Sequence, residues 1–162
     1  MTDYQGLVEV IIVGWHTYQE ALIKAVSPLS TDELALRSAP HLRTVEEIAT
    51  HIIGARARWF YMLMGEGGDA FEKFGRWDRT GMKERNAQEI VSGLEATWKG
   101  MHQAIGRWSP EDWKKTWEGE DDDVPKVHTR QWVIWHLIEH DVHHGGEISI
   151  TLGMHEASAI DL

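Results

Sequence analysis

The chain of 162 residues contains no cysteine. This absence excludes disulfides, thiolate nucleophiles, and zinc or iron–sulfur sites held by cysteine. Any bound metal must therefore take nitrogen or oxygen ligands. Positive charge is also scarce, because 16 Lys and Arg stand against 26 Asp and Glu and give a net charge of −10. Such a balance repels phosphate groups, so we expect neither nucleic acid nor an anionic membrane as a partner.

Long apolar runs are missing as well. No stretch approaches the roughly 18 apolar residues of a membrane-spanning helix, and the first residues show no basic segment ahead of an apolar one, so we expect no signal peptide. Hydrophobic residues make up 42% of the chain and charged residues 26%, as in ordinary globular proteins. We therefore expect a single soluble, cytoplasmic domain over residues 1–162.

Apolar residues recur at helical spacing in four long segments, and no segment alternates convincingly like a strand. The expected helices cover about 3–25, 45–63, 82–108 and 129–152. Thr44 and Glu47 form a capping-box pattern at the start of the second helix, and Gly65 and Gly153 are expected to end the second and fourth. Four helices of this length predict an all-α fold, a four-helix bundle.

The connections between these helices differ in character. About twenty residues follow Gly65, and a loop of that length is usually functional or mobile. We expect a short helical turn at Thr31 and another after Ser109 and Pro110. The acidic run 118–123 lacks the glycine and terminal glutamate of an EF-hand loop, so we expect a solvated connection there.

Four of the ten histidines fall within residues 136–144. On a helical wheel, His136, His140, His143, His144 and Glu147 share one stripe about 100° wide, and such a stripe normally faces the core. Clustered imidazoles in a core are costly without partners, and a divalent metal would supply one.

The favoured ligand pair is His140 and His144, one helical turn apart. His51 is the best third ligand, because Ile48 and Ile52 flank it on the expected inward face of the second helix. Three histidines leave a coordination position open, as in catalytic sites. Two plainer interpretations stand beside this one: a single inward histidine is usually a satisfied core residue, and a pair spaced by four can arise by chance on a surface.

The remaining histidines carry weaker predictions. His136 and His143 are expected to support a ligand, to line a pocket or to lie at a dimer surface. The other five show no useful pattern and are expected at the surface or in local structure: His16, His41, His102, His128 and His155.

Nine tryptophans are unusual for a chain of this size. Five have the spacing of core residues, namely Trp15, Trp59, Trp98, Trp132 and Trp135. Four lie in or beside connections and could line a ligand pocket, namely Trp77, Trp108, Trp113 and Trp117. On the wheel, Trp135 points away from the histidine stripe, either toward the first helix or toward a partner subunit. Exposed aromatic surface often marks an interface, so we expect a two-fold homodimer.

Two motifs in the sequence resemble those of the DinB/YfiT-like superfamily. The run WVIWHLIEHDVHHGGEI, residues 132–148, is similar to the last-helix motif, and HLRTVEEIATH, residues 41–51, is similar to the segment that carries the second-helix histidine. The resemblance implies an up-down-down-up four-helix bundle with a divalent metal, often nickel or zinc. It assigns His51, His140 and His144 as the ligands.

The end of the motif departs from the pattern of the superfamily. A common His-His-Arg-Gly-Gln ending is replaced here by residues 143–147, His-His-Gly-Gly-Glu. Gly146 keeps a small residue that would permit close helix approach. Glu147 could support a ligating histidine, act as a fourth ligand or accept a proton, so Glu147 and His143 are the candidate catalytic bases. The missing arginine weakens any role in holding an anion at that position.

Superfamily members with assigned activities are thiol S-transferases that use bacillithiol, mycothiol or glutathione, and thiol-dependent isomerases. The resemblance therefore implies a metal-dependent thiol transferase acting on a small electrophile. The thiol must be an external low-molecular-weight compound, because the chain has no cysteine. A metal-dependent hydrolase and a non-catalytic metal- or ligand-binding module are the alternatives.

Overall fold

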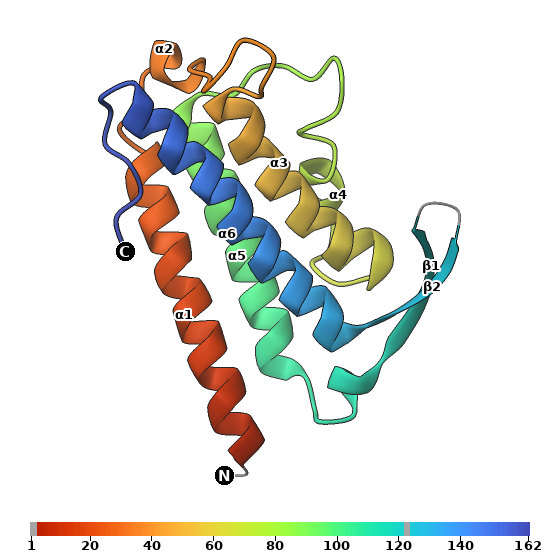
Figure 1. The fold of residues 1–162 in the computed structure, drawn as a ribbon. Helices are drawn as coiled ribbons and strands as arrows, with labels where there is room; N and C mark the ends of the chain where they lie inside the picture. Colours follow the sequence, from red (N-terminus) through yellow and green to blue (C-terminus); the bar gives the residue numbers. More distant parts are fainter. Residues whose placement is uncertain (1–2, 122–123) are drawn as a thin grey trace.

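The computed structural model describes residues 3–121 and 124–162. The protein is mostly helical, and its long helices pack side by side (Figure 1). They are α1 (Asp3–Val26), α3 (Val45–Ala57), α5 (Ala87–Arg107) and α6 (Arg130–Met154), and α3 continues as the π-helical turn η1 (Arg58–Leu63). No described helix has both the length and the apolar composition that crossing a membrane would require.

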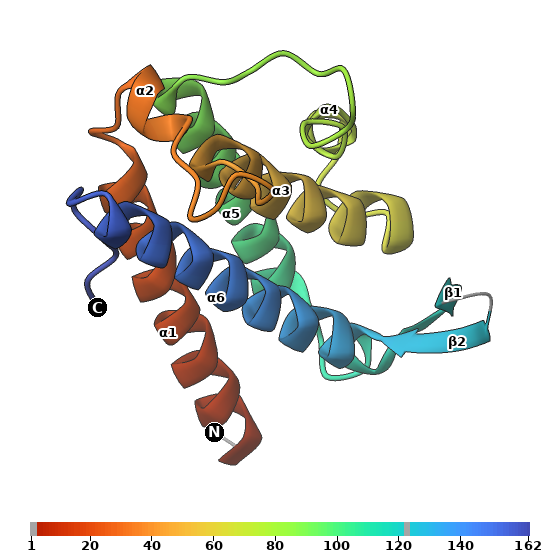
Figure 2. The ribbon, with the colours of Figure 1, turned by 45° about the horizontal axis from the view of Figure 1, so that its top comes forward.

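Shorter elements connect the long helices. They are α2 (Thr31–Leu34), α4 (Asp69–Phe74), the 3-10 turn η2 (Asp112–Lys114), and the strands β1 (Thr116–Asp121) and β2 (Val124–Thr129). The two strands form an antiparallel hairpin in which Thr116 lies opposite Thr129. Figure 2 shows this hairpin extending from the start of α6 away from the helices.

Local sequence signals explain where the helices begin. The predicted capping box of α3 is confirmed, since the Glu47 amide donates to Thr44 Oγ1 (3.0 Å) and the Thr44 amide donates to Glu47 Oε2 (2.7 Å). The predicted start of the third long helix near residue 82 is wrong by five residues. Asn86 caps α5 by accepting a hydrogen bond from the Glu89 amide (2.9 Å), and helix α5 therefore begins at Ala87.

Two of the predicted connections are wrong. The acidic segment expected to be a solvated connection is largely β1, and its pairing with β2 was hidden because charged residues interrupt the apolar alternation; Asp122 and Asp123 lie outside the described residues. The long segment after Gly65 contains α4, whose Phe71 is buried against the helices. Gly153 does not end the fourth helix as expected, because α6 continues two residues past the expected end at 152, to Met154.

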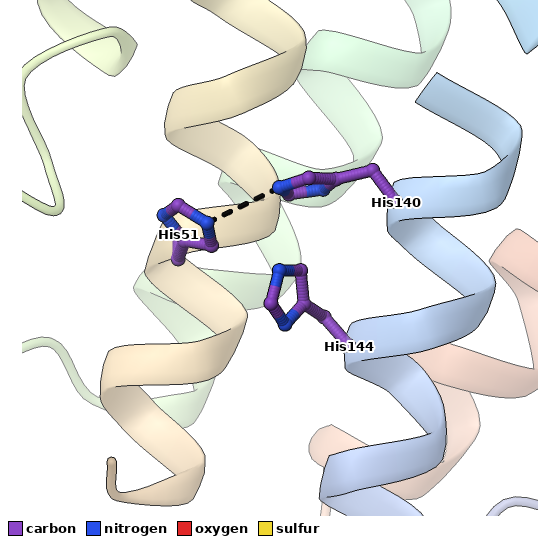
Figure 3. A group of neighbouring side chains, drawn as sticks. All are labelled: His51, His140 and His144. Atoms are coloured by element: carbon purple, nitrogen blue, oxygen red, sulfur yellow. Dashed lines mark hydrogen bonds between the residues drawn. The ribbon is translucent and has the colours of Figure 1, made fainter. Parts of the chain in front are cut away.

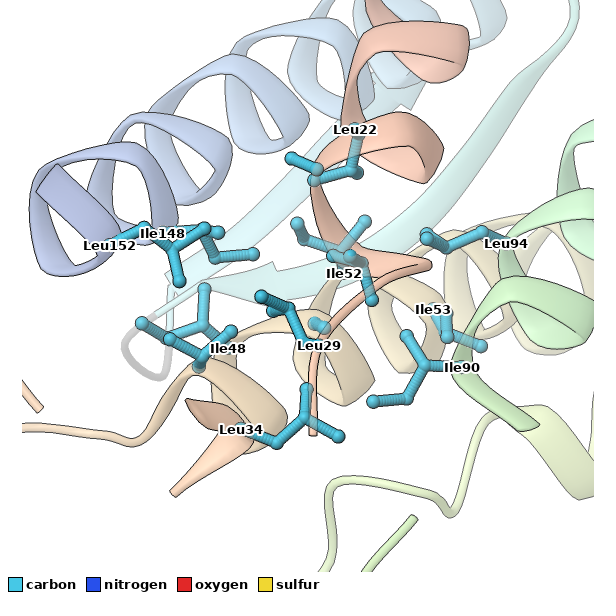
Figure 4. Close-up of a cluster of buried hydrophobic side chains, with 14 residues drawn as sticks. Leu22, Leu29, Leu34, Ile48, Ile52, Ile53, Ile90, Leu94, Ile148 and Leu152 are labelled. Atoms are coloured by element: carbon cyan, nitrogen blue, oxygen red, sulfur yellow. The ribbon is translucent and has the colours of Figure 1, made fainter. Parts of the chain in front are cut away.

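Most of the core at the α2 end of the molecule comes from aliphatic side chains of the long helices (Figure 4). Figure 4 labels Leu22, Leu29, Leu34, Ile48, Ile52, Ile53, Ile90, Leu94, Ile148 and Leu152. A second cluster, around Phe60, Met101 and Leu137, continues the core toward the hairpin end. Helices α3 and α6 are in direct contact with each other.

A close approach of α1 to α6 depends on a glycine, although not on the one that the sequence indicated. A Cβ at Gly145 would clash with the Tyr18 hydroxyl, whereas one at Gly146 would meet nothing within 4 Å. The Tyr18 hydroxyl donates to the Val142 carbonyl (3.3 Å) across this contact. The prediction that Gly146 permits the approach is therefore wrong by one position.

A fully buried ion pair joins α3 to α6. Nη2 of Arg56 lies 2.7 Å from Oδ2 of Asp141, and Nε of Arg56 donates to the same oxygen at 3.0 Å. From α1, Trp15 Nε1 donates to Asp141 Oδ2 (2.6 Å). One carboxylate thus fixes the positions of three helices.

Replacement of Asp141 by alanine should be strongly destabilising, because it leaves the Arg56 charge buried without a partner. Loss of one member of a buried pair costs about 3–5 kcal/mol, and urea unfolding followed by circular dichroism measures it. The matched control is Glu72→Ala, which removes the exposed pair with Arg76 and should cost less than about 1 kcal/mol. Similar losses in both variants would contradict the structural role of Asp141.

Candidate metal centre

Three histidines converge between α3 and α6. His51 comes from α3, His140 and His144 come from α6, and the three side chains point toward one another (Figure 3). Nε2 of His51 lies 3.1 Å from Nε2 of His140. One nitrogen of each ring lies within 4.8 Å of the other two. The structure therefore brings together the three residues that the sequence singled out as ligands, and the group could bind a metal.

Two carboxylates orient these rings from outside the cluster. His51 Nδ1 lies 2.7 Å from Asp78 Oδ2, and His144 Nδ1 lies 2.7 Å from Glu147 Oε2. An ionised carboxylate only accepts hydrogen bonds, so each Nδ1 carries the proton. The Nε2 lone pairs of both rings are then free to face the cluster. Metal-binding histidines typically have this second hydrogen bond to a carboxylate.

Asp78 is itself held in place by Arg58. Nη1 and Nη2 of Arg58 donate to its two carboxylate oxygens at 2.6 and 2.8 Å. Burial raises the pKa of Asp78, but the hydrogen bonds from His51 and Arg58 outweigh burial and hold that pKa well below its usual range. The pair fits against α3 because Gly54 has no side chain: a Cβ there would lie 2.7 Å from Asp78 Oδ1.

The surroundings of His140 and His144 lower the pKa values of both imidazoles. Burial, with smaller contributions from the neighbouring His144 and His51, lowers the pKa of His140 to about 3. Burial also lowers the pKa of His144, although the hydrogen bond to Glu147 acts in the opposite direction. A metal ligand must be an unprotonated imidazole, so this environment favours the binding-competent form.

The donor set fits a divalent ion of the zinc or nickel type. Tetrahedral coordination with metal–nitrogen bonds of about 2.0–2.1 Å places two ligand nitrogens about 3.3–3.4 Å apart, close to the 3.1 Å between His51 and His140. Nδ1 of His140 is buried and has no hydrogen-bond partner among the described residues. Imidazole nitrogens suit zinc, nickel and similar metals.

Glu147 and His143, the candidate bases, lie at the outer edge of the cluster. Oε1 of Glu147 is 3.7 Å from His143 Nε2, while its Oε2 holds His144. Glu147 with His143 and His144 forms a second group whose spacing could hold an ion. The His143 side chain is 67% exposed, so the expectation that the whole stripe faces the core is wrong for this residue, because only the part of α6 beside α3 is covered.

An aromatic wall extends from the histidine cluster toward the hairpin. His136 stacks on Trp132, with ring centroids 4.9 Å apart, and contacts Trp59 at 4.9 Å. Its centroid lies 6.0 Å from that of His140. His128 contacts both tryptophans and is 5% exposed. The prediction of a surface position for His128 is wrong, because the unexpected hairpin turns this residue of β2 inward.

The tryptophans divide differently from the prediction. Trp15 and Trp98 are buried as expected, but Trp135 is 61% exposed and does not pack in the core. Trp77 lines a cavity beside the cluster. Trp108 and Trp117 do not line that cavity; their ring centroids lie 4.0 and 5.1 Å from Cζ of Arg130, and the two rings enclose its guanidinium.

Asp78 and Arg58 are residues of the candidate site that the sequence analysis missed. Asp78 lies 27 positions after His51 in a segment without helical periodicity. Arg58 follows the capping-box helix as an ordinary charged residue. The only available signal was an acidic residue within a long connection, and this does not indicate which histidine it contacts.

The sequence and the fold that carry this histidine cluster can be compared with those of known proteins. The family model of the DinB superfamily matches residues 15–148. The chain belongs to the DinB superfamily. No curated protein matches it in sequence.

Two solved DinB-like proteins share the fold. The protein from Bacillus cereus ATCC 10987 is 18% identical, with a TM-score of 0.74 over 96% of this chain and 97% of that chain. The protein from Bacillus subtilis is 13% identical, with a TM-score of 0.66 over 94% and 96% of the two chains. At these identities the likeness concerns the fold alone.

Replacement of Asp78 by asparagine should weaken zinc binding about 10–100-fold, because the carboxylate that fixes the His51 tautomer is lost. Competition with a chromogenic chelator measures the affinity. Asp69→Asn is the matched control, since it removes the same charge from an exposed position on α4. An unchanged affinity in the Asp78 variant, with unchanged thermal stability, would refute the orienting role.

Proposed function

We propose that this DinB-superfamily protein is a metal-dependent thiol S-transferase that joins an external low-molecular-weight thiol to a small electrophile. One observation carries the proposal: one ring nitrogen from each of His51, His140 and His144 lies within 4.8 Å of the other two, while carboxylates hold the outer nitrogens of two of these rings. We assign the three histidines as ligands of one zinc or nickel ion. A bound divalent ion supplies Lewis acidity, which lowers the pKa of a coordinated thiol or water.

The residues of the chain would handle the proton. We assign Glu147, which is partly exposed at the outer edge of the cluster beside His144, as the group that accepts the proton of the incoming thiol. His143, 3.7 Å from Glu147, can pass this proton to solvent. The thiol sulfur then forms a bond to the electrophilic carbon, and the leaving group departs with its electron pair. The wall of Trp59, Trp132 and His136 would limit water beside the reacting groups.

The proposal includes the setting of the reaction. We place it in the cytoplasm, where small thiols are kept reduced. We also propose the up-down-down-up arrangement for the four long helices, which the directions of α1, α3, α5 and α6 in Figures 1 and 2 support.

Zinc or nickel titration of protein purified without a histidine tag should give one ion per chain. His51→Ala should weaken binding at least tenfold, because the two histidines of α6 cannot complete the site; His41→Ala, at an exposed position, is the matched control. The loaded protein, mixed with bacillithiol, mycothiol or glutathione and a chlorodinitrobenzene, should consume the thiol only when metal is present.

Other outcomes distinguish the alternatives. A metal content that stays near zero after dialysis against both ions would refute the metal site. Metal binding without thiol consumption would refute the transferase and indicate a binding module. Ester or amide cleavage without added thiol would indicate a hydrolase.

We further propose that the protein forms a homodimer. Trp135, Val142 and Ile150 expose apolar surface on α6, and Leu7 and Val10 do so on the neighbouring α1. Exposed apolar surface often marks a protein interface, and two-fold dimers are the commonest closed assemblies.

Light scattering at micromolar concentration should give twice the chain mass of 18.6 kDa. Trp135→Glu should shift the protein to monomer, because it would place a charge in the interface. The control Met62→Glu, at an exposed apolar position on η1, should leave the mass unchanged. A monomeric mass for the unaltered protein would overturn the assignment.

A further inference from the structure

A cavity of about 650 Å³ borders the histidine cluster. It is lined by α2, the connection from α2 to α3, the first half of α3, Arg58 of η1 and the irregular segment between α4 and α5, and these elements can be followed in Figure 2. Its wall includes His51, Asp78 and Arg58. The cavity therefore reaches the cluster from the side of Asp78, and its size is typical of small-molecule sites, which span about 300–1,000 Å³.

The charge of this wall is opposite to that of the chain. Six cationic side chains line the cavity: Arg37, Arg43, Arg58, Arg79, Lys83 and Arg85. Four acidic side chains join them: Glu46, Glu47, Asp78 and Glu84. A protein with a net charge of −10 thus presents an excess of positive charge in this cavity.

Most of the cations already have partners. Arg58 forms an ion pair with Asp78, and Nη1 of Arg37 lies 3.5 Å from Oε2 of Glu47. Lys83 and Arg85 share the carboxylate of Glu89, which lies outside the cavity wall.

Two arginines on the wall have no such partner. Arg43 and Arg79 are exposed, and neither makes an ion pair or a side-chain hydrogen bond with any described residue. Their guanidinium groups are free to contact a ligand. Arginine presents a rigid fork of donors that matches the two oxygens of a carboxylate or phosphate.

The acidic side chains on the wall are mostly engaged. Glu47 caps α3, and Asp78 lies between His51 and Arg58. Glu46 accepts a hydrogen bond from the Arg85 amide (3.1 Å). Glu46 and Glu84 make no ion pair among the described residues, so the positive excess of the wall comes from its six cationic against four acidic side chains. Because Thr44 and Glu47 already satisfy the start of α3, the free arginines and not the helix end provide the binding groups.

We propose that this cavity binds the oxyanion of a small molecule, a carboxylate or a phosphate, through Arg43 and Arg79. For its catalytic consequence the inference rests on the proposed function: a substrate held here by its anionic end would have its other end beside His51. The substrate class is then a small electrophile or thiol that carries a carboxylate or phosphate. The binding itself requires no metal.

Isothermal titration calorimetry on the metal-free protein tests the proposal with two probes, succinate and inorganic phosphate, at low salt. Saturable binding of either probe is expected, and the preferred probe identifies the oxyanion. Arg43→Gln and Arg79→Gln should each weaken this binding about tenfold, which corresponds to about 1.4 kcal/mol. Arg76→Gln is the matched control, because it removes the same charge from an exposed residue outside the cavity wall.

Two results would overturn the proposal. One is that neither probe shows saturable binding at concentrations up to about ten millimolar. A dissociation constant above that concentration corresponds to a binding free energy weaker than about 3 kcal/mol. The other is an equal loss in all three arginine variants, which would indicate a general effect of net charge. Because no metal is present, failure of this test leaves the metal titration unaffected, and failure of the metal site leaves anion binding measurable.

Discussion

The buried ion pair between Arg56 and Asp141 is the interaction on which the arrangement of the candidate metal centre depends. It joins α3 to α6 at one point inside the protein, and the Trp15 hydrogen bond adds α1. His140 directly precedes Asp141, and His51 lies five positions before Arg56. Because neither charge can be left unpaired in the core, the two helices have one allowed register, and this register places the histidines opposite one another.

The centre combines neutral ligands with an outer layer of charge. Burial and mutual repulsion lower the pKa values of His140 and His144, which keeps their nitrogens available to a cation. Asp78 and Glu147 lie behind the rings, where they hold protons on the outer nitrogens. Arg58 then balances Asp78. His51 and Asp78 also line the cavity that contains Arg43 and Arg79. The proposed cation site and the proposed anion site would therefore share these two residues.

The sequence allowed prediction of those features that depend on local spacing. The capping box of Thr44 and Glu47 located α3, and the spacing of His140 and His144 located one side of the cluster. Features that depend on contacts distant in sequence were not predictable. Asp78 reaches His51 only because a long segment folds back over α3, and β1 pairs with β2 despite its acidic residues. Likewise, wheel geometry could not tell Gly145 from Gly146, since the choice depends on where Tyr18 of α1 lies.

Gly54 links His51, a candidate metal ligand, to a part of the chain with little regular structure. A glycine within a helix costs about 1 kcal/mol relative to alanine, yet its missing side chain is what admits Asp78 from the segment 75–86. The carboxylate that orients His51 therefore belongs to an irregular segment, the kind that opens more readily than packed helices. Opening of that segment would release the ring while α3 and α6 stay folded. The rate of metal exchange would then follow local opening, measurable by hydrogen exchange, and not global unfolding.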